Sequence, residues 1–336
     1  MIDLRSDTVT KPTASMLAFM QKAQVGDDVF GEDPSINALE EKSAQLFGKE
    51  AGIFCPSGTM TNQIAINVHT QPGDEVICHR LSHIYNYEGG GIAKNSGASV
   101  RLLEGNRGNI LADEIKKNIN PDDVHHPITR LVALEDTCNK AGGAILDFEE
   151  IKKVRSICHE GNLNLHLDGA RLFNRLVASP IDYKVYADQF DSISLCLSKG
   201  LGAPVGSLLL GTHEFISKAR RIRKVFGGGM RQAGIIAAGG LFALENHVER
   251  LAEDHKHATS VESVLKELPH VESVNPVETN IIVFHLRSGI DPDEYVLDLA
   301  NRGVLCFSIG AQAIRFVFHL DVKDEQVEEL IKKLKA

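Results

Sequence analysis

The chain has 336 residues, of which 43% are hydrophobic, enough for one large domain and one small one. Its 36 basic and 45 acidic side chains give a net charge of −9, which argues against nucleic-acid and membrane-surface partners, because both attract basic proteins. The start shows no signal-peptide pattern, no apolar run is long enough to cross a bilayer, and six cysteines form no Cys-x-x-Cys pair. We therefore expect a cytoplasmic protein with free thiols.

Short apolar, β-branched runs alternate with helical patterns over the first three quarters of the chain. The predicted strands are Ala51–Cys55, Glu75–His79, Ser99–Leu103, Arg130–Glu135, Asn162–Asp168, Ser192–Ser198 and Ser207–Gly211. Helices are predicted between most of them, as at Asn37–Phe47, Met60–His69 and Phe148–Glu160. This alternation predicts an α/β fold, with a mostly parallel seven-stranded sheet covered by helices on both faces. The link between the last two strands is too short for a parallel crossover, which predicts one antiparallel hairpin.

The texture of the chain changes after Gly240. The expected order is a charged helix, a strand, a helix, two strands and a final Lys/Glu-rich helix, over His247–Leu268, Thr279–Leu286, Asp291–Gly303, Val304–Ser308, Ala313–Leu320 and the C-terminus. This order predicts a smaller α+β domain. We divide the chain into a large domain, residues 1–245, and a small C-terminal domain, residues 246–336.

Lys199 directly follows the predicted strand Ser192–Ser198. Strand alternation puts it on the same face as three apolar residues, where a charged ammonium is costly to bury but a Schiff-base lysine is well placed. A lysine at a strand end is more often structural or exposed. The glycine-rich link Gly200–Gly206 favours the functional interpretation, since it lets the backbone approach a planar cofactor.

Two further strand ends carry unusual residues. Asp168 ends a predicted strand and could hold the proton of a pyridinium nitrogen; its alternative role is a salt bridge with Arg171. Ser57, Gly58 and Thr59 join a strand to a helix, where free N–H groups and hydroxyls suit a phosphate, although ordinary helix capping explains them as well. Reactive groups gather beyond the carboxyl ends of parallel strands. The order phosphate loop, Asp, Lys is typical of aminotransferase-like pyridoxal-phosphate enzymes.

Seven motifs in the same order resemble the low-specificity L-threonine aldolases. They are Asp3-Leu-Arg-Ser-Asp-Thr-Val-Thr-Lys-Pro, Val25-Gly-Asp-Asp-Val, Pro56-Ser-Gly-Thr-Met, Ser82-His-Ile-Tyr, His166-Leu-Asp-Gly-Ala-Arg, Leu197-Ser-Lys-Gly-Leu and Gly227-Gly-Gly-Met-Arg-Gln-Ala-Gly. The similarity runs from residue 3 to at least Arg315. It implies the aminotransferase-like fold type I and an enzyme that cleaves L-threonine or L-allo-threonine to glycine and acetaldehyde.

The resemblance also implies a cofactor, pyridoxal 5'-phosphate. Lys199 would hold it as an imine, Asp168 would pair with the pyridine nitrogen, and His83 would stack on the ring. Gly58, Thr59 and Arg231 would bind the phosphate. Ser57 and Arg171 would also contact the cofactor. The family builds its sites at a dimer interface, so a homodimer or homotetramer is implied.

Ser6, Arg171 and Arg315 would clamp the carboxylate of the amino-acid substrate, between the two domains. The candidate bases for the β-hydroxyl proton are His83 and His125, or a water held by either. The chain departs from the family pattern at Asp136, Cys138 and Phe30, and these positions concern aldehyde scope and efficiency.

Other functions stay open on the sequence. A pyridoxal-phosphate β-eliminating lyase or an amino-acid racemase would keep Lys199 and Asp168 but break a different bond. A cofactor-free α/β binding module would share the fold without needing Lys199. No metal site is expected, because the 14 histidines include no His-Glu-x-x-His and the cysteines are unpaired in sequence.

Overall fold

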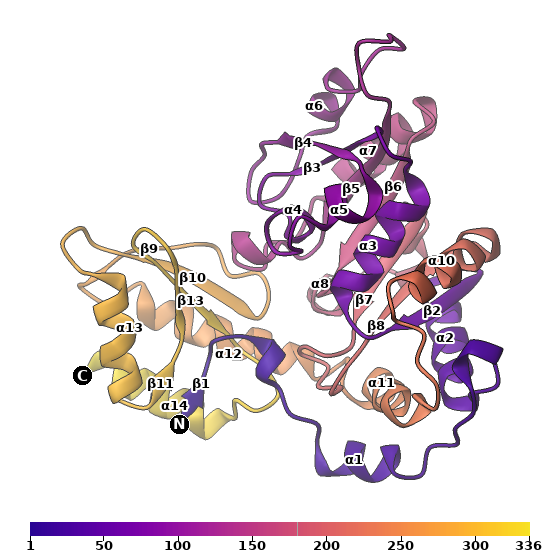
Figure 1. Cartoon of the computed structure of the whole chain (residues 1–336). Coiled ribbons are helices and arrows are strands. Elements are labelled where there is room, and N and C mark those ends of the chain that lie inside the picture. Colours follow the sequence, from indigo (N-terminus) through magenta and orange to yellow (C-terminus); the bar gives the residue numbers. More distant parts are fainter. Residues whose placement is uncertain (180) are drawn as a thin grey trace.

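The computed structural model describes residues 1–179 and 181–336 (Figure 1). A seven-stranded sheet has the order β2-β8-β7-β6-β5-β3-β4. Its strands are β2 (Ala51–Cys55), β3 (Glu75–His79), β4 (Ser99–Leu103), β5 (Thr129–Glu135), β6 (Asn164–Gly169), β7 (Ser192–Cys196) and β8 (Ser207–Gly211). Strand β8 is antiparallel to both neighbours, and the other pairs are parallel. Both the mostly parallel sheet and its antiparallel hairpin are confirmed.

Helices cover both faces of this sheet. They are α1 (Ala14–Met20), α2 (Pro34–Phe47), α3 (Gly58–His69), α4 (His83–Asn86), α5 (Gly91–Ser96), α6 (Ala112–Lys117), α7 (Phe148–Glu160), α8 (Leu172–Ala178), α9 (Tyr183–Ala187), α10 (His213–Val225) and α11 (Gly234–Asn246). Leu167 and Leu195 pack in one core cluster with α2, α7, α8 and α11. Residues of α3, α5 and α10 pack on the opposite face. Short 3-10 helices η1 (Asp7–Val9), η2 (Asp28–Phe30) and η3 (Asn139–Ala141) lie in the connections.

Helix α3 starts where the site will form. The Ser57 hydroxyl accepts a hydrogen bond from the backbone N–H of Met60 at 3.2 Å, so it caps the helix after β2 ends. The buried residues that follow are first polar and then apolar: Thr61 and Asn62 face the sheet with polar groups, whereas Ile64 and Ala65 pack in the core. The interface between α3 and the central strands is therefore partly polar.

The C-terminal part forms a four-stranded antiparallel sheet of order β12-β13-β10-β9. Its elements are α12 (Leu251–Leu265), β9 (Val271–Val274), β10 (Ile281–Leu286), α13 (Pro292–Asn301), β11 (Val304–Leu305), β12 (Phe307–Gly310), β13 (Ala313–Val317) and α14 (Asp324–Lys335). The single predicted strand Val304–Ser308 is wrong, because β11 pairs with a different partner from β12. The smaller α+β unit is present.

The N-terminal residues lie with this small unit. Strand β1 (Ile2–Asp3) pairs in parallel with β11, and Ile2 and Leu4 belong to the small unit's core (Figure 1). The chain then crosses to the large sheet through η1. The division at residue 245 therefore misplaced the first residues, because their pairing partner lies about 300 positions away in sequence.

Within the described residues, no helix combines the length and the apolar character needed to cross a membrane.

Candidate active site

A pocket of about 150 Å³ lies at the carboxyl ends of β6 and β7, beside the start of α3. Its lining comprises Pro56, Ser57, Gly58, Thr59, Asn62, His83, Asp168, Ala170, Cys196, Ser198 and Lys199. Strand β2 runs in the same direction as β7, so its carboxyl end reaches the same edge. The three strand ends singled out in the sequence thus meet in one place.

The start of α3 forms one wall of the pocket. Ser57 and Thr59 are exposed there, and the free N–H groups of the first helical turn favour an anion. A Cβ atom on Gly58 would lie 2.6 Å from the sulfur of Cys196, so a larger residue would need Cys196 to move. The wall therefore fits a phosphate group held close to the backbone.

Lys199 lies three residues after β7 ends and is half-buried in the pocket. Leu197, on the same face, is fully buried in the core of the large sheet. Within residues 1–179 and 181–336, the side chain of Lys199 has no hydrogen bond or ion pair. Its positive charge nevertheless acts on a neighbouring carboxylate, because it helps to lower the pKa of Asp7.

Asp168 is buried on β6, with 3% of its surface exposed. Its Oδ2 accepts a hydrogen bond from Asn62 Nδ2 at 2.9 Å, and its Oδ1 accepts one from the backbone N–H of Ala170 at 3.1 Å. Both contacts stabilise the ionised carboxylate. Asp168 can therefore offer a fixed negative charge to a cationic ring nitrogen.

His83 begins α4 at the edge of the pocket. Its Nδ1 lies 3.0 Å from Glu88 Oε1, and its backbone N–H donates to Glu135 Oε2 at 2.7 Å. Burial alone would lower the pKa of His83, but the Glu88 hydrogen bond and the charges of Asp168, Glu88 and Glu135 outweigh burial and raise the pKa. Burial and the charge of Asp168 raise the pKa of Glu135 to about 7. One side-chain nitrogen or oxygen atom from each of His83, Glu88 and Asp168 lies within 4.8 Å of the corresponding atoms of the other two.

Two arginines lie next to the pocket, Arg171 buried and Arg315 half-buried. Arg171 donates two hydrogen bonds to Asp7, from Nε and Nη2, each at 2.7 Å. The Asp-x-x-Arg spacing suggested Asp168 as its alternative partner, but the structure pairs it with Asp7 from the N-terminal segment. Among the described residues, the partners of Arg315 are neutral: Asn139 Oδ1 at 3.1 Å and the Arg5 carbonyl at 3.0 Å.

The electrostatics of Arg315 favour an anion. Its Nε is buried without a hydrogen-bond partner in the described part of the chain. Burial, followed by the positive charge of Arg171, lowers the pKa of Arg315. Ser6 lies in the same N-terminal segment, where its hydroxyl accepts from Thr8 at 2.8 Å. A substrate carboxylate between the two guanidinium groups would relieve their repulsion.

Two predicted site residues lie elsewhere in this chain. The side chain of His125 is 84% exposed and its Nδ1 lies 2.7 Å from Asp123, just before the amino end of β5. That end of the sheet is opposite to the pocket. Arg231 is 53% exposed and pairs with Asp27 at 2.8 Å, with its guanidinium 6.0 Å from the centre of the Phe30 ring. The structure brings neither residue into the pocket of its own chain.

The three residues that depart from the family pattern, Asp136, Cys138 and Phe30, lie outside the lining of the pocket. Asp136 is fully buried and accepts a hydrogen bond from the Tyr186 hydroxyl at 2.6 Å, and its Oδ2 lies 3.3 Å from Arg175 Nε. Cys138 is buried in a small apolar cluster. Phe30 is 72% exposed, and its ring lies beside Arg231.

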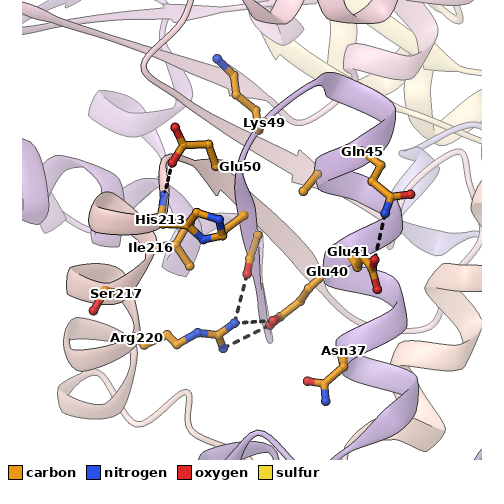
Figure 2. Close-up of a pocket in the computed structure, with 13 residues that line it drawn as sticks. Asn37, Glu40, Glu41, Gln45, Lys49, Glu50, His213, Ile216, Ser217 and Arg220 are labelled. Atoms are coloured by element: carbon orange, nitrogen blue, oxygen red, sulfur yellow. Dashed lines mark hydrogen bonds and ion pairs between the residues drawn. The ribbon is translucent and has the colours of Figure 1, made fainter.

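A wider cavity of about 620 Å³ lies between α2 and α10 (Figure 2). Its charged groups already have partners: Arg220 pairs with Glu40, and the backbone N–H of His213 donates to Glu50 at 2.8 Å. No residue that the sequence marked as functional lines it. The smaller pocket at Lys199 is therefore the candidate active site.

Sequence reasoning missed Asn62, Glu88 and Glu135, and it gave Asp7 no role. A signal for Asn62 existed, because His166, Ser192 and Ser194 alternate with apolar residues on neighbouring strands and so require polar partners from the covering helix. No comparable pattern marks Glu88.

Comparisons with known proteins agree with this arrangement. Residues 3–288 match the beta-eliminating lyase family. The chain therefore belongs to that family, a group of lyases.

Relatives that match over nearly the whole chain identify a narrower family within this class. The chain is 43% identical over 334 residues to the low specificity L-threonine aldolase of Escherichia coli (strain K12), covering 98% of this chain and 97% of that protein. It is 39% identical over 333 residues to low-specificity L-threonine aldolase 1 of Arabidopsis thaliana, covering 97% and 93%. The chain belongs to the low-specificity L-threonine aldolase family.

Solved structures support the fold. Leishmania major threonine aldolase gives a TM-score of 0.86 at 20% identity, covering 100% of this chain and 99% of that one. Sphingomonas wittichii serine palmitoyltransferase gives 0.79 at 16% identity, covering 99% and 86%. The predicted aminotransferase-like α/β fold is confirmed.

Proposed function

We propose that the protein cleaves β-hydroxy-α-amino acids, such as L-threonine and L-allo-threonine, to glycine and an aldehyde. One observation carries the proposal: Lys199, the buried Asp168 and the start of α3 share a pocket, and the partners of nearby Arg315 in the described part of the chain are neutral oxygens. The names of the most similar relatives point to the same reaction.

Pyridoxal 5'-phosphate fits the residues of this pocket. Lys199 would hold it covalently, and Asp168 would hold the proton of its ring nitrogen. The phosphate would be bound by Ser57, Gly58 and Thr59. The close approach of Gly58 to Cys196 and the hydrogen bond that Asn62 donates to the buried Asp168 carboxylate support this fit. When bound, the cofactor supplies an electron sink for bond cleavage at the substrate's α-carbon.

The chain's own residues would orient the substrate and move one proton. Arg171, Arg315 and Ser6 would fix the substrate carboxylate, which sets the direction of the bond to be broken. His83 would accept the proton of the β-hydroxyl, directly or through one water, and, despite its partial burial, the hydrogen bond with Glu88 and the nearby carboxylates raise its pKa, which makes it a stronger base.

A second copy of the chain would complete the site. The resemblance assigns Arg231 to the phosphate and makes His125 the alternative candidate to His83 for the base, and both Arg231 and His125 lie outside the pocket of their own chain. A homodimer or homotetramer would allow these residues to act in a neighbouring copy's pocket. The six cysteines are free and buried, which supports a reducing compartment such as the cytoplasm.

A different reaction at the same site has one specific observation in its favour, the match to the beta-eliminating lyase family. Elimination would give ammonia and a 2-oxo acid, pyruvate from L-serine or 2-oxobutanoate from L-threonine, and racemisation would give the mirror-image amino acid. Product analysis with L-threonine, L-allo-threonine and L-serine separates these reactions from aldol cleavage, which gives glycine and an aldehyde.

The deciding experiment compares Lys199→Ala with Lys49→Ala. Lys49 is a matched control, since it is another half-buried lysine, bound to the Phe190 carbonyl away from the pocket. The wild type and the control should bind pyridoxal phosphate with a visible absorbance band and release acetaldehyde from L-threonine. Lys199→Ala should lose both. Acetaldehyde release by Lys199→Ala at the wild-type rate would disprove the proposal.

A further inference from the structure

Glu88 is a buried carboxylate that the reaction outlined above does not use. Its side chain is completely shielded from solvent, and it follows α4 close to the pocket. Two amide groups donate to it, Asn62 Nδ2 at 2.9 Å and Gln63 Nε2 at 2.6 Å, and His83 Nδ1 lies 3.0 Å from it. Two amide donors, one on each oxygen, favour the anionic form of this buried carboxylate.

The hydrogen bonds around Asn62 fix the orientation of its amide. Its Nδ2 faces two carboxylates, Glu88 and Asp168, each at 2.9 Å. Its Oδ1 lies 3.1 Å from His166 Nε2. The reversed amide would direct its oxygen at both carboxylates, which only accept hydrogen bonds. Glu88 therefore receives the amide N–H on the same oxygen that faces His83.

This arrangement determines which nitrogen of His83 carries the proton. An ionised Glu88 can only accept, so Nδ1 of His83 must be the donor. In the neutral imidazole, Nε2 is then left with its lone pair free. A histidine used as a base requires this tautomer, with one nitrogen held by a carboxylate and the other available to the substrate.

Several charged or titratable groups surround the His83 imidazole. Two of them, Tyr87 and Glu88, directly follow helix α4, which His83 begins. The others are Glu135 on β5, Asp168 on β6 and Lys199, which lines the same pocket. Lys140 lies over the Tyr87 ring at 5.5 Å from its centre. Of the three carboxylates, Glu88 contacts the ring of His83 directly, whereas Glu135 contacts its backbone.

We propose that Glu88 is a positioning residue that holds His83 as the Nδ1–H tautomer and directs Nε2 at the substrate hydroxyl. The inference rests on the proposed function for the identity of the substrate. The tautomer itself does not depend on the reaction and can be measured without it.

The first test is nitrogen-15 NMR of the histidine rings in the full-length protein, without and then with pyridoxal phosphate. His83→Asn assigns the signal. Above its titration, wild-type His83 should carry the proton on Nδ1. Glu88→Gln should increase the acid dissociation constant of His83 at least about tenfold, since the contacting charge is lost, and should populate the other tautomer.

Glu135→Gln is the matched control, because it removes a nearby charge without touching the ring. It should shift the titration less than Glu88→Gln and leave the tautomer unchanged. A wild-type His83 that carries its proton on Nε2 would overturn the proposal without any variant, so the test does not depend on the folding of Glu88→Gln. An unchanged titration and tautomer in folded Glu88→Gln would overturn it as well.

The second test is a double-mutant cycle on the cofactor-loaded enzyme. Glu88→Gln should lower kcat about 10-fold or more and shift the acidic limb of its pH profile. In the His83→Asn background the same change should lower kcat less than about 2-fold, because Glu88 acts through His83. Equal losses in both backgrounds would mean a purely structural role. If NMR shows the expected tautomer but no aldehyde forms, the proposed reaction fails and the positioning role stands.

Discussion

A single amide nitrogen, Asn62 Nδ2, lies 2.9 Å from Asp168 Oδ2 and 2.9 Å from Glu88 Oε1. It thereby holds two buried carboxylates near each other despite their repulsion. The network continues through His166, whose Nδ1 lies 2.8 Å from Ser192 Oγ. Burial lowers the pKa of His166 to about 4, so this ring is neutral near neutral pH. Neutral His166 must donate from Nε2 to the Asn62 oxygen and accept at Nδ1. This hydrogen bond orients the Asn62 amide so that its N–H groups face Asp168 and Glu88.

Asn62→Leu should therefore destabilise the protein strongly. It keeps the size of the side chain but removes one donor from each of two buried carboxylates and leaves one imidazole N–H without its acceptor, each loss costing about 1–3 kcal/mol. We expect a loss of about 3–5 kcal/mol in the free energy of unfolding, measured in urea. Asn67→Leu is the control on the same helix, since Asn67 donates only to the Asn95 carbonyl, at 2.7 Å. Equal losses for both variants would show that the carboxylates do not depend on Asn62.

Arg315→Lys should weaken substrate binding more than cofactor binding. Its guanidinium has neutral partners and an unpaired Nε, so the substrate carboxylate would be its ionic partner. A lost charge-assisted hydrogen bond of about 1.5–3 kcal/mol corresponds to a roughly 10- to 150-fold lower kcat/KM for L-threonine. Arg107→Lys, which alters a pair with Glu278, is the control. An unchanged KM for Arg315→Lys would remove Arg315 from the carboxylate site.

The parts of this site that the sequence predicted share one cause. Ser57, Asp168 and Lys199 each stand at the carboxyl end of a strand, and strands that run in the same direction end at the same edge of a sheet. Apolar runs of five to seven residues marked those strands well, so the sequence alone was enough to predict that three separate motifs meet.

The parts that sequence did not predict depend on partners far apart in the chain. Arg171 pairs with Asp7, 164 positions away, because β1 pairs with β11 and the chain then returns to the large sheet. Local spacing suggested Asp168 instead. Glu88 lies in a loop without periodicity, so only the packing of α3 against α4 reveals its three partners.

Mixing two variants should show whether copies share their sites. Arg231 lies outside its own pocket, so a phosphate role requires a neighbouring copy. Lys199→Ala and Arg231→Leu should each lose most activity at limiting cofactor. After dissociation and reassociation together, activity should partly return, because a hybrid contains one site with neither change. Hybrids that form, as seen by native mass spectrometry, without regained activity would place Arg231 outside the site.

Asp136→Asn should affect stability and not cofactor binding. Asp136 is the carboxylate partner of buried Arg175, two of whose nitrogens have no hydrogen-bond partner in the described residues. Removing one member of a buried ion pair costs about 3–5 kcal/mol. Tyr186→Phe, which removes one hydrogen bond to Asp136, should cost about 0.5–1.5 kcal/mol. Because burial raises the pKa of Asp136 to about 7, the loss should be measured at about pH 8.5, where the carboxyl group is ionised, and a loss under about 1 kcal/mol there would contradict the ion pair.

His69 should make the protein sensitive to acid. It is half-buried and stacks on Phe215, with ring centres 4.7 Å apart, and its Nε2 lies 2.8 Å from Ser192 Oγ. Burial lowers its pKa from 6.5 to about 3. A histidine whose pKa is lower in the folded state contributes stability above its unfolded pKa, and that contribution is lost as the pH falls from 6.5 towards the folded value.

Urea unfolding of wild type and His69→Phe at about pH 7.5 and about pH 5 measures this effect. The wild type should lose up to about 2 kcal/mol more than His69→Phe between these pH values, since each pH unit below 6.5 is worth about 1.4 kcal/mol per proton. His213→Phe is the control, because His213 is exposed at the start of α10 and should not change the pH dependence. The same pH dependence in wild type and His69→Phe would mean that His69 takes up its proton in the native state as readily as in the unfolded chain.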